Sequence, residues 1–214
     1  MIIHQKSQLI SILLFFGLLA TSPMISKEKT VNKNIIGIVS VKAKWYYFDS
    51  LLKNGYTNSI PEYKAAPGLL FKYYHYIQRD SQKDFGGIYL WKDLESANSW
   101  YNKDWFERIK EKRGSDPKLD LFEVESIKDF VSEDFDYNSI AEQSVTLFIS
   151  QVNEKDIEKL LLPTKGLVRT YILNKDKTKY GVLLFESKYL AEQFVKNIGI
   201  LKVDYYSTPV LLKN

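Results

Sequence analysis

The 214-residue chain contains no cysteine. Without a thiol it can form no disulfide, no cysteine-ligated zinc site and no iron–sulfur cluster, and it has no cysteine nucleophile. Its stability therefore depends on side-chain packing. A hydrophobic content of 45% and a charged content of 26% are ordinary values for a globular protein.

Histidine is almost as scarce, since only His4 and His75 are present. His4 lies next to an apolar N-terminal segment, so His75 is the only histidine expected in the folded part of the chain. One histidine would have to serve every role in a metal site or in a Ser-His-Asp triad. We therefore expect neither, and we predict no metal and no cofactor.

Long runs of one charge are also absent. Thirty Lys and Arg residues against 26 Asp and Glu residues give a net charge of +4. The charges are interspersed, as in the pair Lys83 and Asp84, which is typical of a solvated mixed-charge surface. We expect no nucleic-acid partner. Two carboxylates of an acidic segment, Asp134 and Asp136, are interpreted as linker residues.

The N-terminus has the pattern of a secretory signal. Lys6 supplies a positive charge, residues 9–20 are almost wholly apolar, and small residues follow at Ala20 and Ser22. The apolar run is shorter than the roughly 20 residues that span a bilayer. We predict a signal peptide over residues 1–22, export to the periplasm or the extracellular space, and no other membrane contact. Pro23 after the small residues leaves an uncleaved anchor as the alternative.

The chain also contains an internal repeat. Residues 87–100 align without a gap on residues 181–194, and residues 67–73 align on residues 165–171. Both copies show a glycine, an apolar strand that ends in an aromatic residue, a helix N-cap, an alanine and a second aromatic residue. A repeat of this kind indicates two copies of one structural unit.

Each copy predicts the order strand, helix, strand, strand, helix, strand. Apolar alternation predicts strands and apolar spacings of three and four predict helices. In the first half we expect a strand at 35–44, a helix over 45–65 that Gly55 and Pro61 weaken or break, and strands at 69–78 and 87–91 with a polar hairpin tip between them. A helix that begins after Asp93, with a candidate break at Asn102-Lys103, and a strand at 119–127 follow. In the second half the elements are expected at 145–150, 154–162, 167–173, 181–185, 188–197 and 203–211.

This order is that of the ferredoxin-like unit, an α+β fold. Both helices of such a unit cover one face of its sheet and leave the other face open. Two units, at residues 35–130 and 140–214, can cover these faces by packing together as an intramolecular barrel. The short linker favours that arrangement over two independent domains. We expect a monomer with an internal pseudo-dimer, or a higher oligomer.

The first half resembles the YdhR-like monooxygenases of the dimeric α+β barrel superfamily. The resemblance covers residues 35–127 and rests on Pro-Gly-Leu-Leu-Phe-Lys-Tyr at 67–73 and Gly-Gly-Ile-Tyr-Leu-Trp at 86–91. The second half departs from the pattern at Tyr180 and Phe185. The resemblance implies a pocket between sheet and helices, and oxygenation of a small aromatic compound without a cofactor.

Two residues are candidates for proton transfer, His75 and Tyr73. His75 has the only side chain expected to titrate near neutral pH, and alternation places Tyr73 on the same strand face. The alternative is a buried histidine whose ring is satisfied by a tyrosine or a carbonyl.

The predicted substrate-binding residues are mainly aromatic, because flat rings stack on an aromatic substrate. They are Lys72, Tyr89, Trp91, Trp100 and Trp105. At the equivalent positions of the second copy most of these rings are replaced by other apolar or aromatic residues. This favours a packing role for the rings. Lys72 and His75 are instead replaced there by Thr170 and Leu173, so these two positions are the better functional candidates.

Three functions remain open at this stage. The first is a cofactor-independent monooxygenase for a small aromatic compound. The second is a non-enzymatic binding protein for a small apolar ligand. The third is a partner-binding domain without an open pocket.

Overall fold

The computed structural model describes residues 33–200 and 202–214. The predicted signal peptide at residues 1–22 lies outside this part of the chain. No helix among the described residues is long and apolar enough to cross a membrane.

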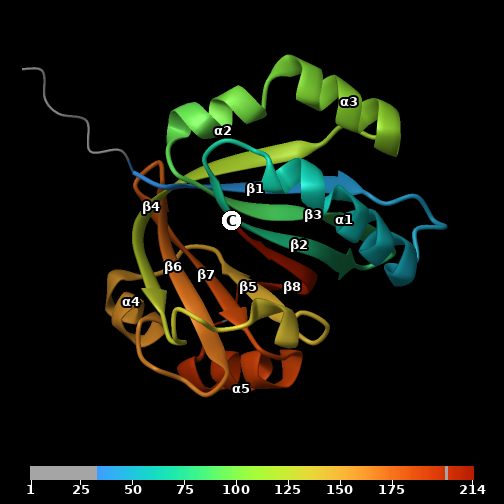
Figure 1. The fold of residues 1–214 in the computed structure, drawn as a ribbon. Helices are drawn as coiled ribbons and strands as arrows, with labels where there is room; N and C mark the ends of the chain where they lie inside the picture. Colours follow the sequence, from blue (N-terminus) through green and yellow to red (C-terminus); the bar gives the residue numbers. More distant parts are fainter. Residues whose placement is uncertain (1–32, 201) are drawn as a thin grey trace, which may run out of the picture. The chain divides into compact units, whose positions relative to one another are not determined.

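The order of elements is the predicted βαββαβ, twice (Figure 1). The first half contains β1 (Ile35–Lys42), α1 (Asp49–Lys64), β2 (Leu69–Arg79), β3 (Gln82–Trp91), α2 (Leu94–Trp100), α3 (Lys103–Arg113) and β4 (Lys118–Asp129). A 3₁₀ turn (Tyr137–Ser139) lies in the linker. The second half contains β5 (Val145–Ile149), α4 (Glu154–Leu160), β6 (Leu167–Lys175), β7 (Thr178–Phe185), α5 (Lys188–Ile198) and β8 (Val203–Lys213).

The eight strands form one closed antiparallel barrel. Its order is β1-β3-β2-β8-β5-β7-β6-β4, so each half contributes four adjacent strands. The halves join where β2 pairs with β8 and where β4 pairs with β6. Closure removes the free strand edges and buries the two sheet faces that the helices leave open. The predicted intramolecular α+β barrel is confirmed.

The barrel interior is one hydrophobic cluster drawn from both halves. It includes Ile36, Phe71, Tyr73 and Ile88 from the first half and Val168, Tyr171, Leu173, Val182 and Leu184 from the second. Two further clusters lie on the outside of the barrel, one beneath the helices of each half. Helices α1, α2 and α3 cover the first half, and α4 and α5 cover the second (Figure 1).

Local sequence accounts for the helix starts. The side chain of Asp93 accepts a hydrogen bond from the Ser96 N–H at 2.8 Å, and that of Ser187 accepts one from the Leu190 N–H at 3.5 Å. Such caps satisfy backbone donors that the first turn leaves free. Both N-caps predicted from the repeat are confirmed.

The break at Asn102-Lys103 is confirmed: the helix that follows Asp93 is two helices, because the Asn102 side chain caps a new start at the Trp105 N–H. Two other features differ from the sequence prediction. The predicted polar tip between the second and third strands is a tight turn, since β2 runs to Arg79 and β3 begins at Gln82. Helix α1 continues through Pro61, which lies in its last turn.

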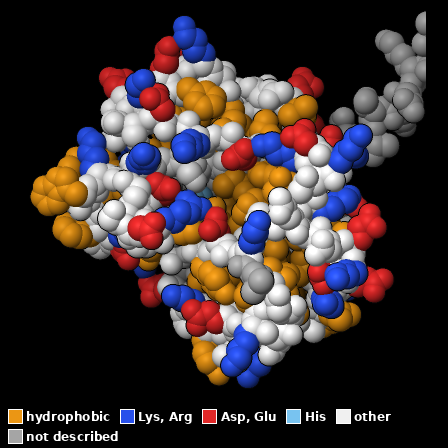
Figure 2. Space-filling model, turned by 180° about the vertical axis from the view of Figure 1, so that it is seen from behind, with side chains coloured by type: hydrophobic (Ala, Val, Ile, Leu, Met, Phe, Trp, Pro, Cys, Tyr) orange, Lys and Arg blue, Asp and Glu red, His pale blue; other side chains and the backbone are white. Residues whose placement is uncertain are grey.

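The surface carries mixed charge. On the face seen in Figure 2, basic and acidic side chains are interspersed around a central group of hydrophobic side chains. Most ion pairs are exposed, as in Lys33 with Glu123 at 2.9 Å. Exposed pairs of this kind contribute little to stability.

Candidate functional site

A cavity of about 350 Å³ lies on the outside of the barrel, between the sheet of the first half and two of its helices. Strands β1, β2 and β3 form its floor, and α1 and α3 form its walls. The volume is within the range of small-molecule sites. The residues that line it include Val39, Val41, Tyr56, Ser59, Glu62, Tyr63, Lys72, Tyr74, Phe85, Tyr89, Trp105, Arg108, Ile109, Lys112 and Arg113.

Lys72 places a buried amine in this cavity. Its side chain is 2% exposed, and no carboxylate among the described residues lies within 4.0 Å of its amine. The amine nitrogen is 2.9 Å from the ring centroid of Tyr63 and 3.7 Å from that of Tyr74. The electron-rich ring faces are its nearest electrostatic partners.

Burial sets the protonation of these groups. Loss of hydration lowers the pKa of Lys72 well below 10.5, with a smaller opposing effect from Glu62. The same loss raises the pKa of Tyr63 and Tyr89, so both phenols stay neutral. Lys72 therefore lies among neutral rings, and burial shifts its amine toward the uncharged form relative to a lysine in water.

A glycine makes room for the lysine. Lys72 pairs with Tyr89 across β2 and β3, next to Gly87. A Cβ atom at Gly87 would lie 2.9 Å from the Tyr89 ring and 3.0 Å from Lys72 Cε. The absence of a side chain at Gly87 lets the lysine and the tyrosine lie over the strand.

The entrance to the cavity is basic. Helix α3 contributes Arg108, Lys112 and Arg113 to the lining, and α1 contributes one carboxylate, Glu62. Arg108 donates a hydrogen bond of 2.5 Å to that carboxylate. Lys112 and Arg113 have no ion-pair partner among the residues that the structure describes, so the entrance carries uncompensated positive charge.

In the second half the position equivalent to Lys72 is filled by packing. Thr170, which replaces Lys72, donates a hydrogen bond of 3.0 Å to the carbonyl of Leu160 at the end of α4. Leu160 is fully buried, and a Cβ atom at Gly181 would lie 3.1 Å from it. The leucine therefore fills the space over Gly181 that corresponds to the space over Gly87.

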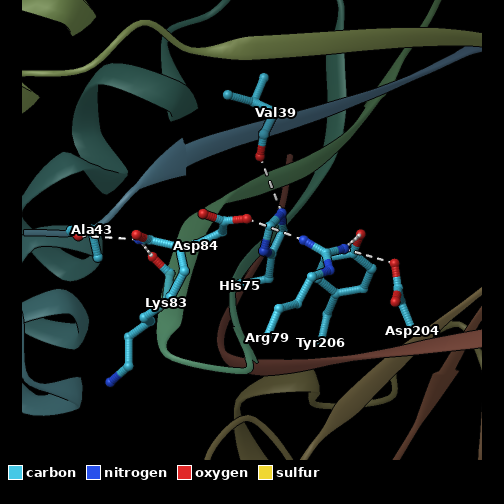
Figure 3. Close-up of polar contacts among 9 residues, drawn as sticks. Val39, Ala43, His75, Arg79, Lys83, Asp84, Asp204 and Tyr206 are labelled. Atoms are coloured by element: carbon cyan, nitrogen blue, oxygen red, sulfur yellow. Dashed lines mark hydrogen bonds and ion pairs between the residues drawn. The ribbon is translucent and has the colours of Figure 1, made fainter.

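His75 and Tyr73 do not line the cavity. Their side chains lie on the opposite face of β2, where Tyr73 belongs to the barrel core. The His75 ring is fully buried against Tyr206, and its Nε2 donates to the carbonyl of Val39 at 3.1 Å (Figure 3). Its Nδ1 has no partner within the described chain. Burial lowers the pKa of His75 to about 3, so the ring is neutral at neutral pH.

His75 lies opposite a second glycine, Gly86, on the neighbouring strand. His75 pairs with Gly86, where a Cβ atom would lie 2.0 Å from the Val39 carbonyl oxygen. In the second half the corresponding pair is Leu173 and Tyr180. At Gly86 the close approach of the β1 backbone leaves no room for a side chain, whereas Tyr180 occupies the equivalent position of the second half. Both departures from the repeat therefore lie in one cross-strand pair of each half.

The three predicted tryptophans separate into two groups. Trp105 lines the cavity together with Tyr89 and Lys72. Trp91 and Trp100 lie 5.9 Å apart, ring centroid to ring centroid, in the core beneath the helices. The structure therefore brings together three of the seven predicted site residues. Sequence reasoning missed Tyr63 on α1, which has no counterpart in the repeat, and Tyr74, which alternation places on the same face as Lys72.

A polar cluster lies near His75 at one end of the barrel (Figure 3). Arg79 donates to Asp84 at 3.1 Å and to Asp204 at 2.7 Å, and so links β3 of the first half to β8 of the second. No three His, Asp or Glu side chains within residues 33–200 and 202–214 gather in a way that could hold a metal ion.

Comparison with known proteins supports the architecture. No protein family matches the sequence, and no curated protein matches it. A structure titled "putative monooxygenase" from Fusobacterium nucleatum superposes with a TM-score of 0.59 at 11% identity, over 86% of this chain and 96% of that one. A second structure with that title, from Lactobacillus acidophilus, gives 0.53 at 12% identity, over 85% and 97%. An anthrone oxidase-like protein gives 0.52 at 10% identity, over 86% and 94%.

The fold is that of the monooxygenase-like dimeric α+β barrels. At these identities the likeness concerns the fold, and function has to be argued from the site.

Proposed function

We propose that this chain is an exported, cofactor-independent monooxygenase of the YdhR-like type that oxidises a small aromatic compound in the cavity of the first half. The observation that carries the proposal is the buried Lys72 amine, which lies among tyrosine rings in that cavity and has no carboxylate partner within residues 33–200 and 202–214. The monooxygenase-like fold is the second support.

The chemistry needs a base and an aromatic substrate that supplies its own electrons. In an anthrone, a CH₂ group flanked by aromatic rings loses a proton to the base, and the resulting carbanion transfers electrons to O₂. One oxygen atom becomes the new carbonyl and the other leaves as water, so CH₂ and O₂ give C=O and H₂O. The substrate is the only reductant.

Lys72 suits the role of that base. An uncharged amine can accept a proton, and the tyrosine faces stabilise the ammonium ion that forms. Tyr89 and Trp105 line the same cavity and offer ring faces to the substrate. A catalytic role for His75 or Tyr73 stays a prediction, and it requires a substrate that reaches the barrel interior.

Oxygen uptake by the full chain with a panel of anthrones and hydroquinones tests the proposal. We expect consumption of O₂ by the wild type and its loss in Lys72→Met, which keeps the length of the side chain. Lys118→Met, at an exposed position of β4, is the matched control and retains activity. Absence of uptake with every substrate would reject the oxygenase, and tight binding without uptake would favour the binding-protein alternative.

A further inference from the structure

We propose that the cavity selects aromatic acids, above all phenols, and binds them as anions while Lys72 holds the proton. The proposal rests on the proposed function only for the place of binding, and it names the chemical class of the substrate. It makes no use of oxygen chemistry, so it can be tested by binding alone.

Charge around the cavity favours an anion. Besides Lys72, three cationic side chains line it, Arg108, Lys112 and Arg113, against one carboxylate, Glu62. That carboxylate is already paired with Arg108. A cation entering the cavity would meet net repulsion, whereas an anion would compensate charges that the protein leaves unpaired.

The buried amine gives the selectivity a chemical basis. When a phenol enters, its O–H bond breaks and an N–H bond forms on Lys72, so a neutral pair becomes a phenolate and an ammonium ion. Each ion then has its counter-ion at hydrogen-bond distance, and such a charge-assisted bond is stronger than a neutral one. The Tyr63 and Tyr74 rings stabilise the ammonium ion from the other side.

The walls select flat ligands. Tyr63, Tyr74 and Tyr89 surround the lysine, and Trp105 lies on α3 above them. Rings of this kind offer stacking surface to an aromatic ligand. An aliphatic acid would gain the ion pair without the stacking, and should bind more weakly.

A simpler explanation of part of the positive charge is helix stability. Basic residues in the last turn interact favourably with the C-terminal end of a helix dipole, and α3 ends in Lys110, Lys112 and Arg113. Lys110 separates the two explanations because it lies in the same turn, pairs with Asp116 at 2.9 Å, and does not line the cavity. Lys72 lies in the sheet and has no such role.

The test uses 4-nitrophenol, whose phenol and phenolate forms absorb at different wavelengths. Titrated with the full chain at a pH where the free probe is mostly protonated, it should gain phenolate absorption as it binds. The methyl ether 4-nitroanisole cannot ionise, and should bind at least about tenfold more weakly.

Substitutions test the role of each basic side chain in binding. Lys72→Met should abolish the phenolate absorption and lower the affinity for 4-nitrophenol about tenfold or more, with little change for 4-nitroanisole. Lys112→Ala should weaken binding of the phenol, and Lys110→Ala should leave it unchanged. A folded Lys72→Met protein, shown by its circular dichroism and cooperative melting, makes these results interpretable.

Equal affinity for the phenol and the ether, or phenolate absorption that persists in Lys72→Met, would overturn the proposal. The proposed function fails separately, if the phenol binds as an anion and no aromatic substrate consumes oxygen.

Discussion

The hydroxyl groups of Tyr73 and Tyr171 lie 2.6 Å apart inside the barrel, and the two residues occupy the same position in the two halves. A contact between equivalent residues is what a two-fold arrangement of similar units produces. Arg169 donates to the Tyr171 hydroxyl at 3.3 Å and pairs with Asp129. The first half has Phe71 at the corresponding position, so the hydrogen-bond network of the interior is not symmetric.

This asymmetry predicts unequal costs for the two tyrosines. Tyr171→Phe leaves the buried Tyr73 hydroxyl without a partner, whereas Tyr73→Phe leaves Tyr171 bonded to Arg169. We expect Tyr171→Phe to lower the free energy of unfolding by about 1–3 kcal/mol and Tyr73→Phe to cost less, about 1 kcal/mol. Urea unfolding of both variants and of the double variant measures the costs. Tyr189→Phe at an exposed position is the control, and equal costs would contradict the network.

Replacement of the buried Lys72 should stabilise the protein, whereas most core substitutions destabilise it. A buried amine without an ion-pair partner opposes folding, so Lys72→Met should raise the free energy of unfolding by about 1–3 kcal/mol. Thermal melting of the two proteins is the measurement. A lower melting temperature in Lys72→Met would show that the lysine stabilises the fold, and would weaken the case that it is kept for function.

The buried Lys72 amine should also make the stability of the protein depend on pH. Because the pKa of Lys72 is lower in the folded state, the unfolded chain binds more protons between that folded pKa and 10.5. Stability should therefore rise with pH through this window, and the rise should be smaller in Lys72→Met. The ionisable groups that face the amine, and are unchanged by the variant, are Tyr63, Tyr74, Tyr89, Glu62 and Arg113. Urea unfolding from neutral to alkaline pH checks the slope, and identical slopes would contradict the lowered pKa.

His75 predicts acid sensitivity. Its pKa of about 3 in the folded state lies below the ordinary value of 6.5, so the unfolded chain binds the extra proton between these values. Stability contributed by the neutral ring should be complete above about pH 6.5 and should fall as pH decreases toward 3. His75→Leu, which introduces the residue of the second half, should reduce that loss. The groups nearest the ring are Tyr206 and Arg79, and both remain in the variant.

Gly86 and Gly55 form a matched pair for a backbone test. A Cβ atom at Gly86 would collide with the Val39 carbonyl, whereas one at Gly55 on α1 meets nothing within 4 Å. Gly86→Ala should cost about 2 kcal/mol or more, and Gly55→Ala should stabilise the helix by up to about 1 kcal/mol. A tolerated alanine at position 86 would contradict the close approach of the two strands.

The fold could be predicted from the sequence because the same structural unit occurs twice in the chain. Repeated glycines, caps and alternating apolar residues predicted both units, and the open sheet faces predicted the barrel. The tight hairpin turn was missed, since it depends on the backbone conformation at Asp80, which has a positive φ.

The residues of the candidate site could be predicted only in part. Comparison of the two copies singled out Lys72, which faces a cavity, and His75, which does not. The two copies differ there in one cross-strand pair, since His75 lies opposite Gly86 and Leu173 lies opposite Tyr180. Such a pairing is not visible in a single sequence. Tyr63 was missed because its contact with Lys72 depends on how α1 lies over the sheet.

The most direct test of the account compares the affinities of Lys72→Met and His75→Leu for 2-naphthol, a phenol without a nitro group. The account places the ligand in the helix-side cavity, so Lys72→Met should lose about tenfold or more in affinity and His75→Leu should match the wild type within about twofold. Loss of binding in His75→Leu with full binding in Lys72→Met would place the ligand inside the barrel and contradict the account.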